Sequence, residues 1–372
     1  MRAAPPCYNC RVPRPIVLSA ALVVALGATS GPARPDPSGA RAVVDPAKGE
    51  MFIDLAPVDL PAHASHHEVV QPPVAMLELP ASGSVYAFRV AMVDSAGREL
   101  PSVLIHHFNL IDPDHRELFL PISRRMIAAG KETGAMSIPW LLFGFPVERG
   151  ERVLASAMLD NPTDSSYHQA RVRLVLSYTP AGRPWPFFRA EPFQLDVAFP
   201  VGDKSFDLPP GRSSRSYEAS PAVPGVIMGI GGHVHRYAQR LEFADATTGH
   251  IIYQASPLTD SGGEIVGVPI ARLYRWSRLG THIVPAHRYR VTVYYDNPGQ
   301  LIPAGGMGVV GGLFVPDRGA TWPATDRTDS LYQRDLRHAM RVGGDHDMMT
   351  MSGHEMPMPG HEGGAGVGHH PR

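Results

Sequence analysis

Cysteine is nearly absent from this sequence, and both cysteines lie close to its N-terminus. Cys7 and Cys10 fall in a segment that is basic and contains no acids, and residues 16–28 after it are apolar and lead into small residues. This is the pattern of a secretory signal peptide. We therefore expect residues 1–30 to be removed on export to the periplasm or the extracellular space. The mature chain would then have no disulfide, no thiolate metal ligand and no cysteine nucleophile.

The sequence also lacks an excess of either charge and any further membrane-spanning run. Its 34 basic and 35 acidic residues are interspersed, so its electrostatics do not favour nucleic acid or an anionic membrane surface as a partner. The apolar run at 16–28 is shorter than the roughly 20 residues that cross a bilayer. An uncleaved N-terminal anchor is thus the less favoured alternative, and the oligomeric state stays open.

A sustained helical period of apolar residues is missing as well. Short helices are expected only at 122–131 and 332–340, whereas 38 prolines and 37 glycines separate many short strand-like runs. Such runs with regular turn signals predict an all-β protein with two tandem jelly-roll-like antiparallel β-sandwich domains. The expected strands are 85–93, 103–111, 152–159, 170–178, 195–201, 225–243, 250–254, 289–295 and 308–315.

The expected organisation has five parts. After the signal peptide, residues 31–80 form a linker and N-terminal arm, 81–205 the first sandwich and 206–318 the second. Residues 319–372 form a disordered tail rich in Met and His. The turn at Asp160-Asn161-Pro162 echoes the one at Asp296-Asn297-Pro298, and in each half a histidine pair precedes it. Two copies of one sandwich unit explain this repeat most simply.

The first candidate metal site lies in the second half. In an extended strand His233 and His235 present their imidazoles on one face, which suits Zn, Cu, Fe or Ni. Met307 follows after a turn, and a thioether shifts the preference toward Cu(I). Chance alternation of histidines and a core-filling methionine is the alternative.

The second candidate site lies in the first half at His106 and His107. Adjacent strand residues face opposite ways, so both can bind one ion only at a bulge, a bend or a strand end. Candidates for the third ligand are Met158, His168 and His115. The histidines at 63, 66 and 67 are expected to be solvated loop residues.

The order His-His, then His-x-His, then Met resembles the copper type II, ascorbate-dependent monooxygenases, which include the peptidylglycine and dopamine hydroxylases. The resemblance covers about 85–315 and implies two sandwiches with one copper each. It implies that His233, His235 and Met307 hold a copper that binds dioxygen. It also implies that His106 and His107 hold an electron-transfer copper.

This sequence departs from that family at several positions. The third histidine of the family's first site falls here on Met158, so a two-His-one-Met site is the alternative there. A substrate-binding Arg and Tyr of the peptide hydroxylases are replaced by Gly231 and Gly311, which disfavours a peptide C-terminus as substrate. The family's disulfides are absent too.

Three functions remain open from the sequence. The first is an exported copper-dependent monooxygenase with an unknown substrate and a small-molecule reductant. The second is a non-catalytic protein of the same fold that holds or delivers copper, which the Met/His-rich tail favours because thioethers and imidazoles suit copper in either oxidation state. The third is a β-sandwich interaction module without metal.

Overall fold

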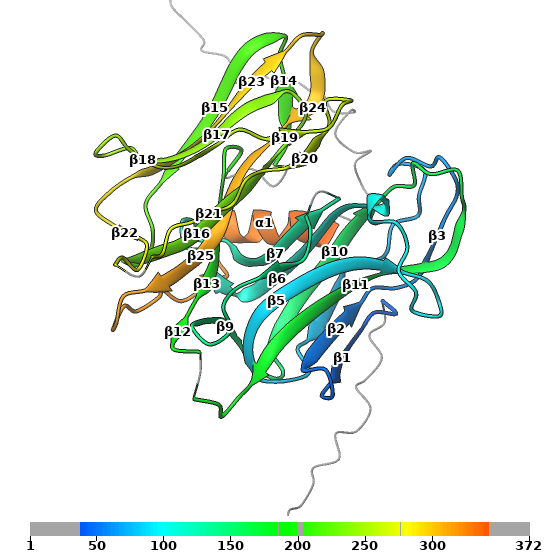
Figure 1. Ribbon diagram of the computed structural model, residues 1–372, viewed down its shortest axis with the longest axis horizontal. Coiled ribbons are helices and arrows are strands. Elements are labelled where there is room, and N and C mark those ends of the chain that lie inside the picture. Colours follow the sequence, from blue (N-terminus) through cyan, green and yellow to red (C-terminus); the bar gives the residue numbers. More distant parts are fainter. Residues whose placement is uncertain (1–37, 132, 185, 200–203, 276, 342–372) are drawn as a thin grey trace, which may run out of the picture. The chain divides into compact units, whose positions relative to one another are not determined.

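The computed structural model describes residues 38–131, 133–184, 186–199, 204–275 and 277–341 (Figure 1). The predicted signal peptide and most of the predicted tail lie outside these residues. The described chain confirms the all-β prediction, because antiparallel strands dominate it. The strands of the N-terminal half are β1 (Arg41–Asp45), β2 (Glu50–Asp54), β3 (Val58–Leu60), β4 (Ala75–Glu78), β5 (Gly83–Val93), β6 (Ile105–Arg116), β7 (Ser123–Gly130), β8 (Met136–Ser137), β9 (Phe143–Val147), β10 (Arg152–Leu159), β11 (Tyr167–Pro180) and β12 (Phe188–Arg189).

In the described part of the C-terminal half, further short strands are followed by one α-helix. Its elements are β13 (Glu191–Asp196), β14 (Phe206–Leu208), β15 (Gly211–Ala219), β16 (Gly225–Val234), β17 (Ala238–Asp245), β18 (His250–Ala255), β19 (Leu258–Thr259), β20 (Ile265–Gly267), β21 (Ala271–Arg272), β22 (Thr281–Ile283), β23 (Tyr289–Asn297), β24 (Ile302–Gly306), β25 (Gly308–Pro316) and α1 (Ser330–Arg341). A single 3₁₀ turn, Ser102–Leu104, precedes β6. Within the described residues, no helix is both long enough and apolar enough to cross a bilayer.

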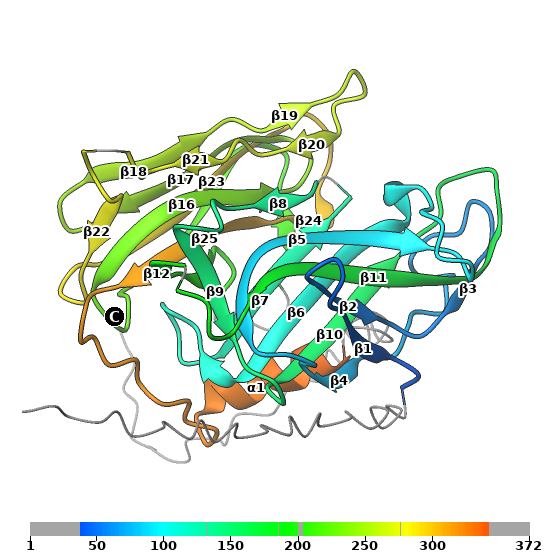
Figure 2. The ribbon, with the colours of Figure 1, turned by 60° about the horizontal axis from the view of Figure 1, so that its bottom comes forward.

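The two halves repeat one strand topology. The first contains the sheet paths β2-β11-β5 and β4-β10-β6-β7, and the second contains β13-β25-β16 and β15-β23-β17-β18. Figure 2 shows the strands of each half arranged as sheets that face each other. Each pair of sheets encloses its own apolar core, one built around Met51, Phe108 and Leu174 and the other around Phe243, Val291 and Phe314.

The repeated Asp-Asn-Pro turns have the same structural role in both halves. The amide of each buried asparagine donates to three backbone carbonyls and so ties the turn to a neighbouring Leu-Pro segment. The bonds are Asn161 Nδ2 to the carbonyls of Leu60, Pro61 and Ser165, and Asn297 Nδ2 to those of Leu208, Pro209 and Gln300.

A second bond at this corner is repeated as well. The backbone N–H of Gln169 donates to Asp59 at 2.9 Å, and that of Ala304 donates to Asp207 at 3.0 Å. Gln169 and Ala304 both have positive φ, 51° and 50°, which side chains other than glycine seldom adopt. The same strained residue in the same bond in both halves supports two copies of one unit.

The structure corrects the expected arm at 31–80. Strands β1 to β4 lie here and are part of the first sandwich, where β2 pairs with β11 and β4 with β10. Met51, Ile53 and Leu60 are fully buried. Proline and charge in this segment mark tight turns between strands and not a linker.

The boundary expected at residue 205 was also wrong. Strand β13 precedes it in the chain but pairs with β25 of the second sandwich. Leu118, Phe119 and Ile122, from the β6–β7 connection, are buried in the second core. The two cores therefore exchange elements and belong to one compact unit.

The expected disorder from residue 319 was wrong as far as residue 341. Trp322 packs on Phe314 with ring centroids 6.0 Å apart, and α1 lies along the sheet that contains β6 and β10 (Figure 2). Arg125 makes a two-bond ion pair with buried Asp335 of α1, at 2.5 and 2.6 Å. The predicted helix at 332–340 is confirmed, and the part of the predicted tail from 342 onward lies outside the described residues.

Two predicted elements have a different form. Residues 122–131, expected as a helix, form strand β7, which pairs with β6 and buries Ile127 and Ala129 in the first core. The expected single strand at 225–243 is two strands, because the chain turns at residues 235–237, where Tyr237 has a φ of 72°.

Candidate metal centre

The His-x-His segment stands at the end of strand β16. Gly232, just before it, packs so closely that a Cβ atom there would lie 2.2 Å from Leu241 and 2.4 Å from the carbonyl oxygen of Val309. Only glycine allows this approach of β16 to its neighbours. His233 then pairs with Val309 and points away from the second core, on the opposite face to Val234.

One tyrosine hydroxyl fixes the chain around His235. Tyr295 Oη accepts the backbone N–H of Met307 at 2.9 Å and that of His235 at 3.3 Å, and it donates to the Met307 carbonyl at 2.5 Å. Burial raises the pKa of Tyr295 to about 12, so the hydroxyl keeps its proton. The backbones of His235 and Met307 are therefore held side by side, as the sequence-based site requires.

A β-bulge positions the histidines of the first sandwich. Met158 of β10 pairs with His107 of β6, but the next residue, Leu159, pairs with Ile105, so His106 is the extra residue. The bulge brings the rings of His106 and His107 together, with centroids 4.6 Å apart. Met158 lies directly opposite His107 and on the same face of the sheet.

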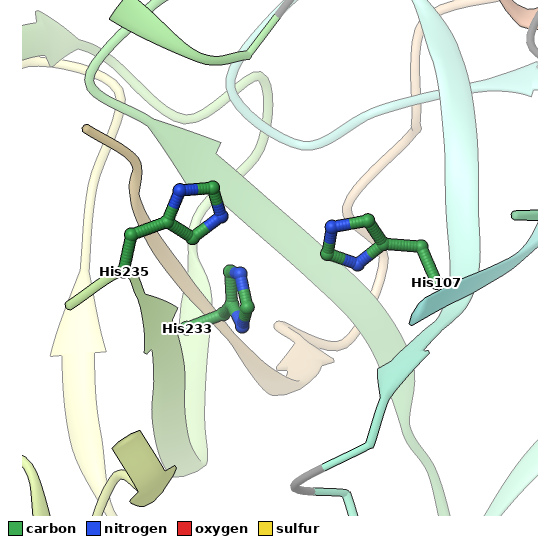
Figure 3. Close-up of side chains that lie close together, drawn as sticks. All are labelled: His107, His233 and His235. Carbon is green, nitrogen blue, oxygen red and sulfur yellow. The ribbon is translucent and has the colours of Figure 1, made fainter. Parts of the chain in front are cut away.

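The structure brings His107 to the histidine pair of the other sandwich (Figure 3). One ring nitrogen of each of His107, His233 and His235 lies within 4.8 Å of the corresponding nitrogens of the other two. Three nitrogens that share one ion at about 2.0–2.1 Å lie about 3.3 Å apart. Small rotations of the three rings would thus bring all of them onto one ion.

The electrostatics of this group suit a metal ion. Burial, with further contributions from the neighbouring imidazoles, lowers the pKa of His107 well below its usual value. His107 is therefore neutral at physiological pH, which is the form that binds metal.

The six predicted ligands are distributed differently from the expectation of two separate sites. His107, His233 and His235 form one three-histidine group between the sandwiches, and His106 lies beside it and outside it. Met158 is the cross-strand neighbour of His107, and Met307 is held next to His235. Both methionines thus occupy backbone positions next to residues of the group.

Histidines that sequence reasoning assigned to solvent lie next to this group. The His66 ring stacks on the His106 ring with centroids 5.3 Å apart, and His67 lies 4.0 Å from His66. His63 and His67 are exposed as predicted, whereas His66 is only half-buried and packs on His106. No spacing signal in the sequence links residues 66 and 106, because the contact is made by a loop on a distant strand end.

The other proposed third ligands take no part. His168 is exposed on β11 beside Asp59. His115, expected at an exposed turn, forms a 2.7 Å ion pair with Asp112, which is fully buried.

Asp112, His115 and Glu151 also lie close together. The Arg124 guanidinium already occupies this group, 2.5 Å from Asp112, and its positive charge opposes a bound cation. The lowered pKa of Asp112, about 2, arises from its bonds to His115 and Arg124, which outweigh burial. This second group is an ion-pair network of the fold.

Comparison with known proteins identifies no family. No protein-family model matches the chain, and no curated protein matches it. Among solved structures it is similar to the major capsid protein P2 of bacteriophage PM2, at 8% identity and a TM-score of 0.30, over 73% of this chain and 100% of that one. It is also similar to Sulfolobus turreted icosahedral virus (9%, TM-score 0.32, 82% and 97%) and to PNGF-II (8%, TM-score 0.34, 71% and 65%). Similarity at this level assigns no function.

Proposed function

We propose that this chain is a copper-binding protein in which one ion bridges the two sandwiches. The observation that carries the proposal is the convergence of His107, from one sandwich, with His233 and His235 from the other. Three imidazoles are a ligand set that zinc, copper, iron and nickel all accept. The choice among these metals depends on the residues next to the imidazoles.

The neighbouring thioethers favour copper over zinc. Met158 lies opposite His107, and Met307 is held beside His235 by the Tyr295 hydroxyl. Thioether sulfur is a soft donor that suits Cu(I), whereas zinc in proteins is bound by Cys, His and carboxylate ligands. Copper binding would use either sulfur as a fourth donor to the three nitrogens.

The chain contributes position and a low-polarity setting to such an ion. The bulge at His106 aims His107, and the Tyr295 hydroxyl fixes the turn that carries His235. The lowered pKa of His107 keeps its ring free of a competing proton. When bound, copper supplies one-electron chemistry and reactivity toward dioxygen.

Copper-dependent hydroxylation is a second candidate function. Three imidazoles leave one position free for a small molecule, as in catalytic metal sites with three protein ligands. In this proposal the protein is exported, and its partner is a small-molecule reductant or a copper donor. The substrate is not identified. Holding or delivering copper needs only the site itself, so the geometry supports that function first.

Copper affinity of single variants tests the bridging site. We expect His107→Ala and His233→Ala each to weaken Cu(I) binding in competition with a chelator by at least about 100-fold, or about 2.7 kcal/mol. His168→Ala, an exposed histidine of the first sandwich, is the matched control and should change nothing. Unchanged Cu(I) affinity in His107→Ala would remove the first sandwich from the site.

Oxygen uptake separates the two candidate functions. A monooxygenase consumes dioxygen when copper and ascorbate are present, and this uptake falls in Met307→Ile. A protein that only holds copper shows the same Cu(I) binding without such uptake.

A further inference from the structure

The histidines beyond the three-histidine group continue as a row toward the surface. Going outward from His107, the ring centroids are 4.6 Å apart to His106, 5.3 Å from His106 to His66, and 4.0 Å from His66 to His67. The rings of His106 and His66 are half-buried, and that of His67 is exposed. We propose that His66 and His106 hold a second metal ion, with Asp160 beside them, and that this outer site takes Cu(II).

The loop that carries His66 is fixed to the end of strand β10. Ala64 accepts the backbone N–H of Asn161 at 2.8 Å, and the N–H of His63 donates to the carbonyl of Thr163 at 3.1 Å. These bonds run between segments about 100 residues apart in sequence. They hold the loop over the strand end next to His106.

Gln71 completes this attachment. Its amide donates to the carbonyls of His66 and Leu159, both at 2.9 Å, and its carbonyl oxygen accepts the N–H of Leu159 at 2.7 Å. The His66 backbone is thereby tied to the residue that pairs across the bulge of His106. Such preorganisation is what a ligand set needs to bind an ion without a large ordering cost.

Asp160 supplies an acidic oxygen on the same side. Its Oδ2 atom lies 3.6 Å from Nδ1 of His106, and its Oδ1 atom is buried and accepts no hydrogen bond within the described part of the chain. A carboxylate beside the second nitrogen of a ligating histidine orients the ring and raises its basicity. A cation held by His106 would also compensate the buried carboxylate oxygen.

The donor types of the two sites differ, and so do the oxidation states that they favour. The inner site combines imidazoles with neighbouring thioethers, whereas the outer site has imidazole donors and a carboxylate beside one of them. Imidazole nitrogens next to a negative charge suit Cu(II), and sulfur donors suit Cu(I). The outer site builds on the proposed copper-binding function but uses different residues, so each can fail alone.

Cu(II) titration of the full chain tests the outer site. We expect His66→Ala and His106→Gln each to remove one equivalent of Cu(II) from the bound total, or to weaken that equivalent by at least about 30-fold, with loss of nitrogen hyperfine lines from its electron paramagnetic resonance signal. Asp160→Asn should weaken the same equivalent less. His63→Ala, in the same loop but exposed, is the matched control and should bind as the wild type does.

Cu(I) affinity of the same variants keeps the two proposals apart. His66→Ala should leave Cu(I) binding at the inner site within about twofold, whereas His233→Ala should abolish it and leave the Cu(II) equivalent in place. Thermal unfolding of His66→Ala, an exchange on a surface loop, checks that the fold is intact. A folded His66→Ala protein with wild-type Cu(II) stoichiometry and affinity would overturn the outer site.

Discussion

The two sandwiches share a scaffold but differ at the positions that carry metal-ligand chemistry. Aligned on their Asp-Asn-Pro turns, Leu159 corresponds to Tyr295, and the bulged residue His106 corresponds to Gln239, which is skipped by the same register shift in β17. His107 then corresponds to Arg240. The bulge itself therefore belongs to the repeated scaffold, and only the first copy uses it to present imidazoles.

The two copies also fix their histidine segments by different groups. In the second, the Tyr295 hydroxyl bonds to the backbones of His235 and Met307. In the first, Leu159 is buried and apolar, and the Gln71 amide bonds to its backbone instead. The same scaffold thus fixes the backbone by two different side chains, a tyrosine at the inner site and a glutamine at the outer one.

The largest expected effect concerns what the copies share. We expect Asn161→Ala and Asn297→Ala to lower the free energy of unfolding by similar amounts, about 2–4 kcal/mol each, because each leaves several backbone carbonyls without a donor. Chemical denaturation measures this. Asp164→Ala and Gln300→Ala, exposed in the same turns, should stay within about 0.5 kcal/mol of the wild type. A large effect in one sandwich alone would argue against a shared corner.

The next effect separates the copies. Tyr295→Phe removes one hydroxyl that serves three backbone groups, so we expect a loss of about 1–3 kcal/mol of stability and about tenfold weaker Cu(I) binding. Gln71→Leu should instead weaken the Cu(II) equivalent about tenfold and leave Cu(I) affinity nearly unchanged. Chelator competition for each oxidation state measures both, and equal effects of both variants on Cu(I) would contradict two separately fixed sites.

The smallest expected effect is a pH dependence in the first sandwich. Asp112 raises the pKa of His115 above its usual value, so this pair stabilises the fold fully below about pH 6.5 and less as the pH rises through the raised pKa. His115→Asn should remove this alkaline loss, which we expect to be under about 1 kcal/mol because the side chain is more than half exposed.

Unfolding free energies of the metal-free proteins at pH 6 and pH 8 measure that difference. His168→Asn is the control, since its ring is exposed on the surface of the same sandwich. At acidic pH the two variants should behave alike. The pKa of Asp112, about 2, keeps its carboxylate charged, and so keeps its contribution to stability, down to strongly acidic pH. If His115→Asn loses as much stability between pH 6 and pH 8 as the wild type does, groups other than His115 cause that loss.

Much of the fold was predictable because alternation and turn signals are local. Strand β10 begins and ends at the predicted residues. Strands β5, β23 and β25 differ from the prediction at one end and β11 at both, by at most three residues. The helix at 122–131 was wrong because this segment pairs with β6, the strand just before it. The arm at 31–80 was wrong because β2, β3 and β4 pair with strands about 80 to 120 residues further along the chain. No local pattern records such pairing.

The candidate site was predictable in part for the same reason. The His-x-His spacing and the need for a bulge at residues 106–107 follow from strand geometry. The approach of His107 to His233 depends on how the two sandwiches pack. The contact of His66 with His106 depends on a loop that hydrogen bonds hold against the end of β10. Neither distance is encoded within a short stretch of sequence.

Anomalous diffraction at the copper edge from crystals of the Cu(I)-loaded protein tests the central claim most directly. We predict one strong peak within about 2.0–2.1 Å of nitrogens from His107, His233 and His235 together. A peak bonded to His233 and His235 alone, with the His107 ring turned away or bonded to a different ion, would contradict it.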